Sequence, residues 1–397
     1  MRAVLCLASY EKGHDFLREA RRQGWEVLLL TSLSLQNKAA WPMESVNEIF
    51  YMPDDQHVWD RTATLNAVSY LARSKNIERI VALDDFDVEV AAMLREHLRV
   101  PGLGDSGVRY FRDKLAMRMR AREAGLRVPA FCGVINHARI SEFLEQTPEP
   151  WVLKPRSMAG SMGIKKLWNR DEVWPMLDSL GDAQSNYVLE SFVTGPVCHV
   201  DSLVADGRVV FAIASQYGRP PMETSHDGGI FSTRILQREG ALSRELVRQN
   251  ALVLSAMGLG KGVSHTEFIL GPEADEIYFL ETSCRVGGAF ISELVQAATG
   301  LNLWAEWAKV ELAEAYPAPA VDNNYAGLLI SLARQEKPDT SAYNDPEIAW
   351  RLDLTHHVGL LVKSPSLARV DQLMNDYVQR VETDFHASLP PSDRPTN

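Results

Sequence analysis

The chain has 397 residues, of which 46% are hydrophobic and 23% are charged, as in an ordinary globular protein. Because single hydrophobic cores stop growing near about 250–300 residues, this length predicts two or three packed units. The 41 basic and 52 acidic side chains give a net charge of −11, which argues against a binder of nucleic acids or anionic membranes. No apolar run approaches the roughly 20 residues of a membrane span, and the four cysteines include no C-x-x-C pair. These features predict a cytoplasmic, multidomain protein.

Residues 1–107 are predicted to form an α/β domain, because short apolar runs alternate with helical patterns. Such alternation indicates a parallel sheet with right-handed crossovers. The first turn, at residues 9–13, lacks the G-x-G-x-x-G pattern of dinucleotide-binding domains. The predicted strands are 3–8, 26–31, 48–52 and 79–83.

From residue 108 the pattern changes towards strands and hairpins. A helix is predicted at about 112–124. The Asp-Gly pair at 206–207 is a strong hairpin turn, and a second hairpin is expected around 271–276. Prolines near residue 318 mark a further boundary. We therefore predict a second domain at 108–313 and a small C-terminal lobe at 314–397, whose last residues are expected to be disordered.

A lysine ends one predicted strand at Lys154, and a loop rich in Gly, Ser and Ala follows at 157–163. An ammonium group and several backbone N–H groups in this arrangement can bind a polyphosphate. The alternative is a solvated lysine beside a surface loop. Taken alone, the motif favours that alternative, because such loops are common.

Two acids, Glu267 and Glu281, lie on the two strands of the second predicted hairpin. Carboxylates that face the same side of adjacent strands can share divalent cations, and Mg²⁺ bound with ATP takes one or two protein carboxylates. The alternative is a pair of exposed acids, whose like charges would cost stability. Because Glu281 follows the apolar stretch 277–280, we favour the metal site.

An arginine and two glycines, Arg285, Gly287 and Gly288, follow Glu281 closely. Arginine can bind a carboxylate or phosphate by a two-pronged contact, and glycine lets the backbone approach a ligand. The alternative is an Arg–Glu pair that caps a helix beginning near residue 289.

These motifs occur in a specific order along the chain: Lys114, Lys154 with its loop, Glu190-Ser191-Phe192-Val193, His199-Val200-Asp201, Glu267 and Glu281-x-Ser283-x-Arg285. The ordered set resembles the ATP-grasp superfamily over roughly residues 108–303. The first hundred residues are similar to the α/β domain that usually precedes the grasp domain. The resemblance implies an N-terminal parallel α/β domain, then an ATP-grasp fold with a mobile lid at about 129–190, and a small C-terminal lobe.

The resemblance also implies ATP and Mg²⁺ as cofactors, with Mn²⁺ as an alternative metal. The lysines would contact phosphates, the 157–163 loop would close over them, and the 190–193 segment would hold adenine largely through backbone groups. The implied nucleotide-binding residues are Lys114, Lys154, Gly160, Ser161, Met162, Gly163, Glu190, Phe192, Val193 and His199. The implied metal ligands are Glu267, Glu281 and Ser283, and the implied substrate and catalytic residues are Arg285, Gly287 and Gly288.

The chain departs from the family pattern at two positions. Val197 stands where the family often has an acid that meets the ribose, and Ser283 replaces the usual asparagine of the second metal motif. The segment 216–229 is predicted to be a long irregular loop, which in a compact domain is often functional. His226, Arg219 or Glu223 could touch substrate there, and the alternative is that they are solvated.

ATP-grasp proteins mostly convert a carboxylate into an acyl phosphate that a nucleophile attacks. The Arg-x-Gly-Gly motif at 285–288 resembles carboxylate–amine (L-amino acid) ligases, which implies a small carboxylic acid and an amine as substrates and an amide, ADP and phosphate as products. One alternative is an ATP-dependent carboxylase or purine-pathway ATP-grasp enzyme, and another is a non-catalytic nucleotide-binding protein. Neither a nucleic acid nor a membrane is an expected partner, and a homodimer is allowed.

Overall fold

The computed structural model describes residues 1–273 and 276–388, and for residues 225–227 it describes the backbone alone. The tail that we expected to be disordered, 389–397, lies outside the described residues. None of the described helices combines the length and the apolar character that crossing a bilayer requires.

The N-terminal part is a four-stranded parallel sheet, as its alternating pattern predicts. The strand order is β3-β2-β1-β6, and every pair is parallel. All six residues of β1 are buried, because a parallel sheet is covered on both faces and its central strands are continuously apolar. The elements are β1 (Ala3–Ala8), α1 (His14–Arg22), β2 (Glu26–Ser32), β3 (Glu48–Met52), the hairpin strands β4 (Asp54–Asp55) and β5 (Val58–Trp59), α2 (Arg61–Leu71), β6 (Ile77–Ala82) and α3 (Val88–Leu98).

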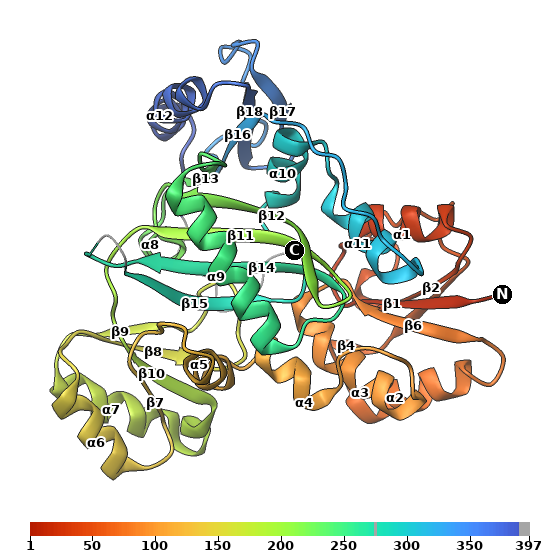
Figure 1. Cartoon of the computed structure of the whole chain (residues 1–397), viewed down its shortest axis with the longest axis horizontal. Helices are drawn as coiled ribbons and strands as arrows, with labels where there is room; N and C mark the ends of the chain where they lie inside the picture. The colour runs from red at the N-terminus through yellow and green to blue at the C-terminus, as the bar shows by residue number, and fades with distance from the viewer. Residues whose placement is uncertain (274–275, 389–397) are drawn as a thin grey trace.

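A small antiparallel sheet follows, with the order β7-β10-β8-β9. Two helices pack on it around a core of its own, which includes Trp151 and Leu189. Figure 1 shows this unit below the end of the large sheet that carries β14 and β15. Its elements, and the two helices that precede it, are α4 (Asp105–Val108), α5 (Lys114–Glu123), β7 (Phe131–Gly133), α6 (His137–Gln146), β8 (Trp151–Pro155), β9 (Lys165–Leu167), α7 (Arg170–Leu180) and β10 (Tyr187–Ser191).

An eight-stranded antiparallel sheet forms the centre of the molecule, with the order β15-β14-β11-β12-β13-β16-β18-β17. The turn between β11 and β12 is the predicted hairpin, and Asp206 and Gly207 both have positive φ, at 49° and 72°, as a tight two-residue hairpin turn requires. The strands are β11 (Val197–Ala205), β12 (Arg208–Tyr217), β13 (Phe231–Ile235), β14 (Gly262–Leu270), β15 (Ile277–Ser283), β16 (Tyr325–Leu332), β17 (Ile348–Arg351) and β18 (His357–Ser364).

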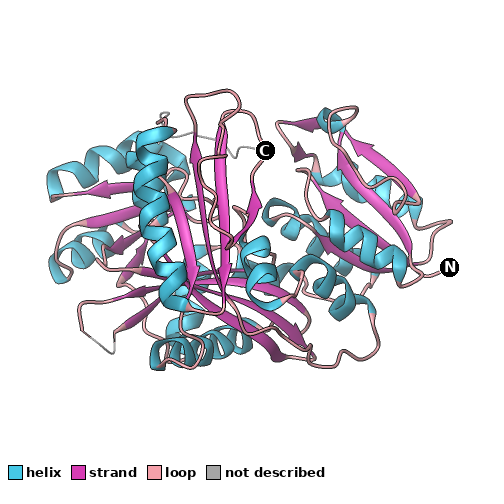
Figure 2. Cartoon of the chain, turned by 90° about the horizontal axis from the view of Figure 1, so that it is seen from above, coloured by secondary structure: helices cyan, strands magenta, loops and turns pink. Residues whose placement is uncertain are grey.

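The C-terminal residues extend this sheet, because β16 pairs with β13 and carries β18 and β17 beyond it. The prediction of an irregular loop at 216–229 is wrong for 221–227, which form a helix that starts with a proline in its first turn, a position that proline favours. Figure 2 shows the N-terminal unit beside the large sheet. The remaining helices are α8 (Pro221–Asp227), α9 (Ala241–Met257), α10 (Ile291–Thr299), α11 (Leu303–Leu312) and α12 (Leu367–Asp384).

The predicted mixed architecture, a parallel α/β domain followed by a large antiparallel sheet, is confirmed. The site described next lies where the small sheet meets β14 and β15 of the large one.

Candidate active site

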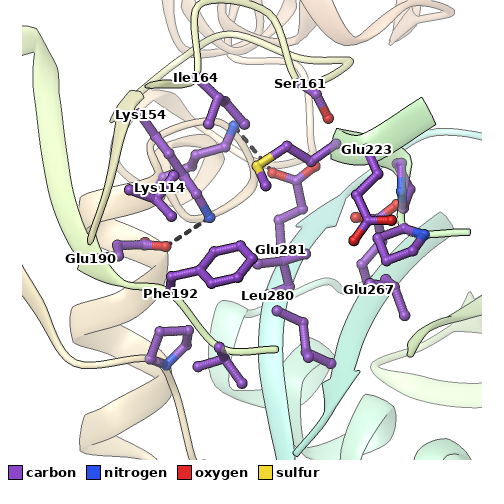
Figure 3. Close-up of a pocket in the computed structure, with 18 of the residues that line it drawn as sticks. Lys114, Lys154, Ser161, Ile164, Glu190, Phe192, Glu223, Glu267, Leu280 and Glu281 are labelled. Carbon is purple, nitrogen blue, oxygen red and sulfur yellow. Dashed lines mark ion pairs between the residues drawn. The ribbon is translucent and has the colours of Figure 1, made fainter. Parts of the chain in front are cut away.

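A cavity of about 920 Å³, open to solvent on one side, lies between the small sheet and the large sheet. Figure 3 shows residues of both sheets pointing into it. We call this cavity the nucleotide pocket after the ligand that the sequence leads us to expect. Nine residues predicted from the sequence line it: Lys114, Lys154, Ser161, Met162, Glu190, Phe192, Val193, Glu267 and Glu281.

One wall of the pocket holds a buried ion-pair triad of Lys154, Glu190 and Arg118. The Lys154 ammonium lies 2.8 Å from Glu190 Oε2, and Arg118 Nε lies 2.8 Å from Glu190 Oε1. Burial by itself raises the pKa of Glu190, but the charges of Arg118 and Lys154 outweigh it and lower that pKa to about 2. Glu190 is therefore an ionised carboxylate that fixes the direction of Lys154 at the pocket wall.

Arg118 was not among the residues that the sequence singled out. It lies four residues after Lys114 on α5, and residues at this spacing share one helix face. It also donates to the backbone oxygen of Leu280 on β15. A basic residue one turn after a predicted phosphate-binding lysine was the signal that could have found it.

Lys114 begins α5 and connects three parts of the site. The side chain of Asp113 caps this helix by accepting from the Leu115 N–H at 3.0 Å. The Lys114 ammonium donates to the backbone oxygen of Met158 in the 157–163 loop at 2.6 Å and lies 3.1 Å from Glu281 Oε2. The same cation thus contacts the loop expected to close over phosphates and one expected metal ligand.

The two acids of the predicted metal site face each other. Glu267 on β14 pairs in register with Glu281 on β15, and both side chains point into the pocket in Figure 3. Like charges directly opposite each other are destabilising without a cation between them. This pair of hard oxygen donors is therefore suited to Mg²⁺, whereas Ser283 does not line the pocket.

Two buried polar side chains, Tyr217 and His265, contact one carboxylate oxygen of Glu267. The Tyr217 hydroxyl donates to Glu267 Oε1 at 2.8 Å, and His265 Nε2 lies 3.5 Å from the same oxygen. Burial favours neutral His265, but Asp201, 2.9 Å from its Nδ1, and Glu267 raise the pKa of His265 to about 9. Burial likewise favours the protonated form of Glu267, and the contact with His265 lowers the pKa of Glu267. Both contacts engage Oε1, which leaves Oε2 as the oxygen better placed for a metal.

His199, Asp201 and His265 bring three ligand atoms within 4.8 Å of one another, a spacing that a metal ion could bridge. Asp201 Oδ2 lies 2.7 Å from His199 Nδ1, and Asp201 Oδ1 lies 2.9 Å from His265 Nδ1. His199 Nε2 also lies 2.8 Å from the Thr233 hydroxyl. The cluster is satisfied by its own hydrogen bonds, and it supports Glu267. His199 is fully buried and does not line the nucleotide pocket.

The predicted substrate residues at 285–288 do not line the nucleotide pocket. One of them, Gly287, lies next to Asp201 and His265. A Cβ at Gly287 would come 3.0 Å from Asp201 Oδ1 and His265 Nδ1, so a larger residue would force these side chains to shift. Burial raises the pKa of Asp85 in the N-terminal domain, but the charges of Arg112 and then Arg285 lower it overall. Arg285 is therefore near enough to Asp85 to act on it electrostatically, and one of its terminal nitrogens donates to the backbone oxygen of Val286 at 2.8 Å.

The remaining predicted residues also lie outside the pocket wall. Gly160 and Gly163 belong to the 157–163 loop, both with positive φ, and a Cβ at Gly163 would come 2.9 Å from Pro155. Gly288 has open space around its Cα. The side chain of His226 lies outside the described residues.

Two further residues of the pocket wall are Val197 and Glu223. Val197, which stands where the resemblance leads us to expect a ribose-contacting acid, makes its part of the wall apolar. Glu223 on α8 brings a carboxylate to the same pocket (Figure 3). The sequence identified Glu223 only as one of three loop residues that could touch substrate, because the helix that presents it was not predicted.

No family model matches the chain. Over 260 residues it is 24% identical to the L-arginine-specific L-amino acid ligase of Bacillus subtilis, an alignment that covers 64% of this chain and 62% of that protein. Over 84 residues it is 29% identical to the D-alanine–D-alanine ligase of a Marinomonas species, covering 21% of this chain and 26% of that protein. The chain therefore spans less than two thirds of the length of these curated relatives.

Solved structures match almost the whole chain. The L-amino acid ligase from Bacillus licheniformis superposes with a TM-score of 0.76 at 17% identity, covering 97% of this chain and 98% of that one. A carboxyaminoimidazole ribonucleotide synthase from Aspergillus clavatus complexed with ATP gives 0.73 at 17% identity, covering 96% and 99%. The chain has the ATP-grasp fold. The small sheet with the order β7-β10-β8-β9 begins at Phe131 and ends at Ser191, which is close to the range 129–190 expected for a lid.

Proposed function

We propose that the protein is an ATP-dependent ligase that joins a small carboxylic acid, such as an amino acid, to an amine and releases ADP and phosphate. The observation that carries this proposal is the convergence of two lysines and two acids on one cavity, Lys114, Lys154, Glu267 and Glu281, beside the loop that contains Arg285. The relatives named as L-amino acid ligases support the choice of substrate class.

The pocket suits a nucleoside triphosphate. Phe192, Val193 and Leu280 supply apolar walls for a base, and the chain segment from 190 to 193 offers backbone groups to its edge. The lysines supply positive charge for the phosphates, which an acidic chain must provide locally. The 157–163 loop, contacted by Lys114, would close over the phosphates and keep water from a reactive intermediate.

Mg²⁺ fits the donor set of Glu267 and Glu281, and when bound it would neutralise phosphate charge. The residues themselves do the rest of the positioning. Tyr217 and His265 hold one oxygen of Glu267, and Lys114 holds Glu281. The pair is thereby kept in one orientation before ATP arrives, which reduces the reorganisation needed during reaction.

The proposed reaction has two balanced steps. A carboxylate oxygen of the acid bonds to the γ-phosphorus while the bond from that phosphorus to the bridging oxygen of ADP breaks, which gives an acyl phosphate. The amine nitrogen then bonds to the acyl carbon, phosphate leaves with the bonding electrons, and the nitrogen loses a proton. Arg285 would hold the carboxylate, and the backbone N–H groups at Gly287 and Gly288 would stabilise negative charge on the acyl oxygen.

The test is to incubate the full chain with Mg·ATP and pairs of amino acids, with L-arginine as one member of a first set, and to analyse nucleotides and products by mass. A new amide and ADP in equal amounts are expected. AMP as the nucleotide product, or ADP release that needs only bicarbonate, would overturn the proposal and favour a carboxylase in the second case. Tight Mg·ATP binding without turnover for any pair would favour the non-catalytic alternative.

A further inference from the structure

A second cavity, of about 1230 Å³, lies between the N-terminal sheet and the large sheet. Its walls come from the edge strand β6, from α3, from the turn between β11 and β12, and from α11. Figure 1 shows β6 next to the end of the large sheet where these strands turn. This interdomain cavity shares no lining residue with the nucleotide pocket, and the proposed reaction does not use it.

The guanidinium of Arg95 lines this cavity and forms no ion pair with a carboxylate of the described residues. Arg95 donates from Nε to the backbone oxygen of Ile80 at 2.9 Å and from a terminal nitrogen to that of Leu103 at 2.6 Å. Both of these partners are backbone oxygens, and among the residues that the structure describes no acid lies within ion-pair distance of Arg95. Burial accordingly lowers the pKa of Arg95, because a buried charge that is hydrogen-bonded but not paired is costly.

A carboxylate lines the same cavity and also lacks a cation within ion-pair distance in the described chain. Burial raises the pKa of Glu311 on α11, although the charges of Arg95, Arg79 and Lys261 all act to lower it. The opposite charges of Arg95 and Glu311 thus influence each other across the cavity without touching. Each retains the capacity to bind a group of opposite charge.

We propose that the interdomain cavity binds a small zwitterion of the α-amino acid class, with its carboxylate at Arg95 and its ammonium at Glu311. A single ligand that carries both charges complements both walls, whereas a simple anion would face Glu311 and a simple cation would face Arg95. Lys261 also lines the cavity, but its ammonium lies 3.7 Å from Asp206 Oδ1, so its charge already has a partner. The apolar remainder of the wall, including Trp307 and Leu259, suits a hydrophobic side chain.

The interdomain cavity is also connected to the proposed active site by one segment of the chain. Cys284 lines it and stands between Ser283 and Arg285 in the sequence. An occupant would therefore touch the segment that carries the proposed substrate arginine. If occupied and empty states hold this segment differently, the ligand changes affinity at Arg285, and substrate changes affinity in the cavity by the same factor. The interdomain cavity is thus placed to act as an effector site.

Glu311 can be replaced without an expected loss of stability. Because burial favours the neutral form of this side chain, Glu311→Gln keeps its size and removes a charge that the folded protein does not favour, so its melting temperature should not fall. A matched control is Glu314→Gln, three residues later, where the side chain is exposed. The variant Arg285→Met shows whether an amino acid binds at the proposed acyl site or in the interdomain cavity, because it removes the charge of the acyl site alone.

The experiment is calorimetric titration of the twenty common α-amino acids into the wild-type chain and these three variants. We expect at least one amino acid to bind the wild type, Glu314→Gln and Arg285→Met equally, and to bind Glu311→Gln at least about tenfold more weakly. Its N-acetyl derivative, which lacks the ammonium group, should bind the wild type at least about tenfold more weakly as well, a measurement that needs no variant.

Three results would overturn the proposal: no amino acid binding the wild type with a Kd below about 1 mM, binding unchanged in Glu311→Gln, or binding lost only in Arg285→Met. Equal affinity of the N-acetyl derivative would show that a simple carboxylate is enough and would also reject the zwitterion. None of these outcomes depends on turnover, so the result stands apart from the proposed ligase activity.

Discussion

Replacing Glu190 by glutamine should destabilise the protein strongly, although the change removes no heavy atom and creates no cavity. Glu190 is fully buried between Arg118 and Lys154, with ion-pair distances of 2.8 Å on each side. Glutamine would leave two cations, one fully buried and one nearly so, without their shared anion. Breaking a buried ion pair by removing one partner typically costs about 3–5 kcal/mol.

The size of the effect follows independently from the pKa of Glu190, which the two cations lower from 4.5 to about 2. Each pKa unit corresponds to about 1.4 kcal/mol, so the ionised carboxylate contributes about 3 kcal/mol to the free energy of unfolding at neutral pH. This value agrees with the cost of about 3–5 kcal/mol for a broken buried ion pair. We expect Glu190→Gln to lower the free energy of unfolding by about 3 kcal/mol at pH 7.

The pH dependence has a definite sign. Because the pKa of Glu190 is lower in the folded state, its contribution is fully present above the unfolded value of 4.5 and is lost as pH falls through about 2. The difference between wild type and Glu190→Gln should therefore be constant from pH 8 to about pH 5 and shrink below that.

The assay is equilibrium urea unfolding followed by circular dichroism, at pH 7 and at steps down to pH 3. The matched control is Glu245→Gln, because the pKa of Glu245 is also lowered to about 2, by hydrogen bonds from Arg248 and Gln249. Its side chain is 38% exposed, so solvent screening should limit the loss to less than about 1 kcal/mol. Equal losses for the two variants, or a Glu190→Gln loss below about 1 kcal/mol at pH 7, would refute the argument that burial sets the strength of the triad.

Other predictions concern the site and the fold. Lys154→Met should lower kcat/KM for ATP by about 10²–10³, measured by ADP release, and an unchanged value would remove this lysine from the site. Glu281→Gln should need more Mg²⁺ for half-maximal turnover, whereas the same Mg²⁺ dependence as wild type would contradict the metal assignment. Tyr217→Phe removes one hydrogen bond to Glu267 and should weaken Mg²⁺ activation by a factor of about 5, without loss of folding in a thermal melt. Burial raises the pKa of Asp87 to about 7, so wild-type stability should fall as pH rises from about 4 to 7, and Asp87→Asn should reduce that fall in urea titrations.

Local and short-range patterns in the sequence were enough to predict the main architecture. Alternating apolar runs predicted the parallel sheet, because a strand buried on both faces is apolar throughout, as β1 is. The Asp206-Gly207 pair predicted its hairpin, because few other residues tolerate two consecutive positive φ values. Nine of the residues predicted from the order of the motifs line the nucleotide pocket, whereas others, such as His199, Ser283 and Arg285, do not.

The helix α8 shows where local patterns fail. The stretch 216–229 contains glycines and prolines that are typical of a loop, yet 221–227 are helical and bring Glu223 to the pocket. Its seven residues are too short for a helix to be stable in isolation. The surrounding tertiary structure therefore determines that this segment is helical and which side chain it presents.

Only the tertiary structure determined the partners of the charged residues. Arg118 and Glu190 are 72 residues apart, and Asp201 and His265 are 64 residues apart. No local pattern in the sequence could therefore predict that they form ion pairs. A buried charge needs a specific counter-charge whose position depends on how whole sheets and helices pack. The sequence by itself therefore determines the strands, the turns and the order of the motifs, because these depend on neighbouring residues. Other features depend on elements that are distant in the sequence and pack together only in the folded protein. These are the ion-pair triad of Lys154, Glu190 and Arg118, the hydrogen bonds to Glu267, and the unpaired charges of the interdomain cavity.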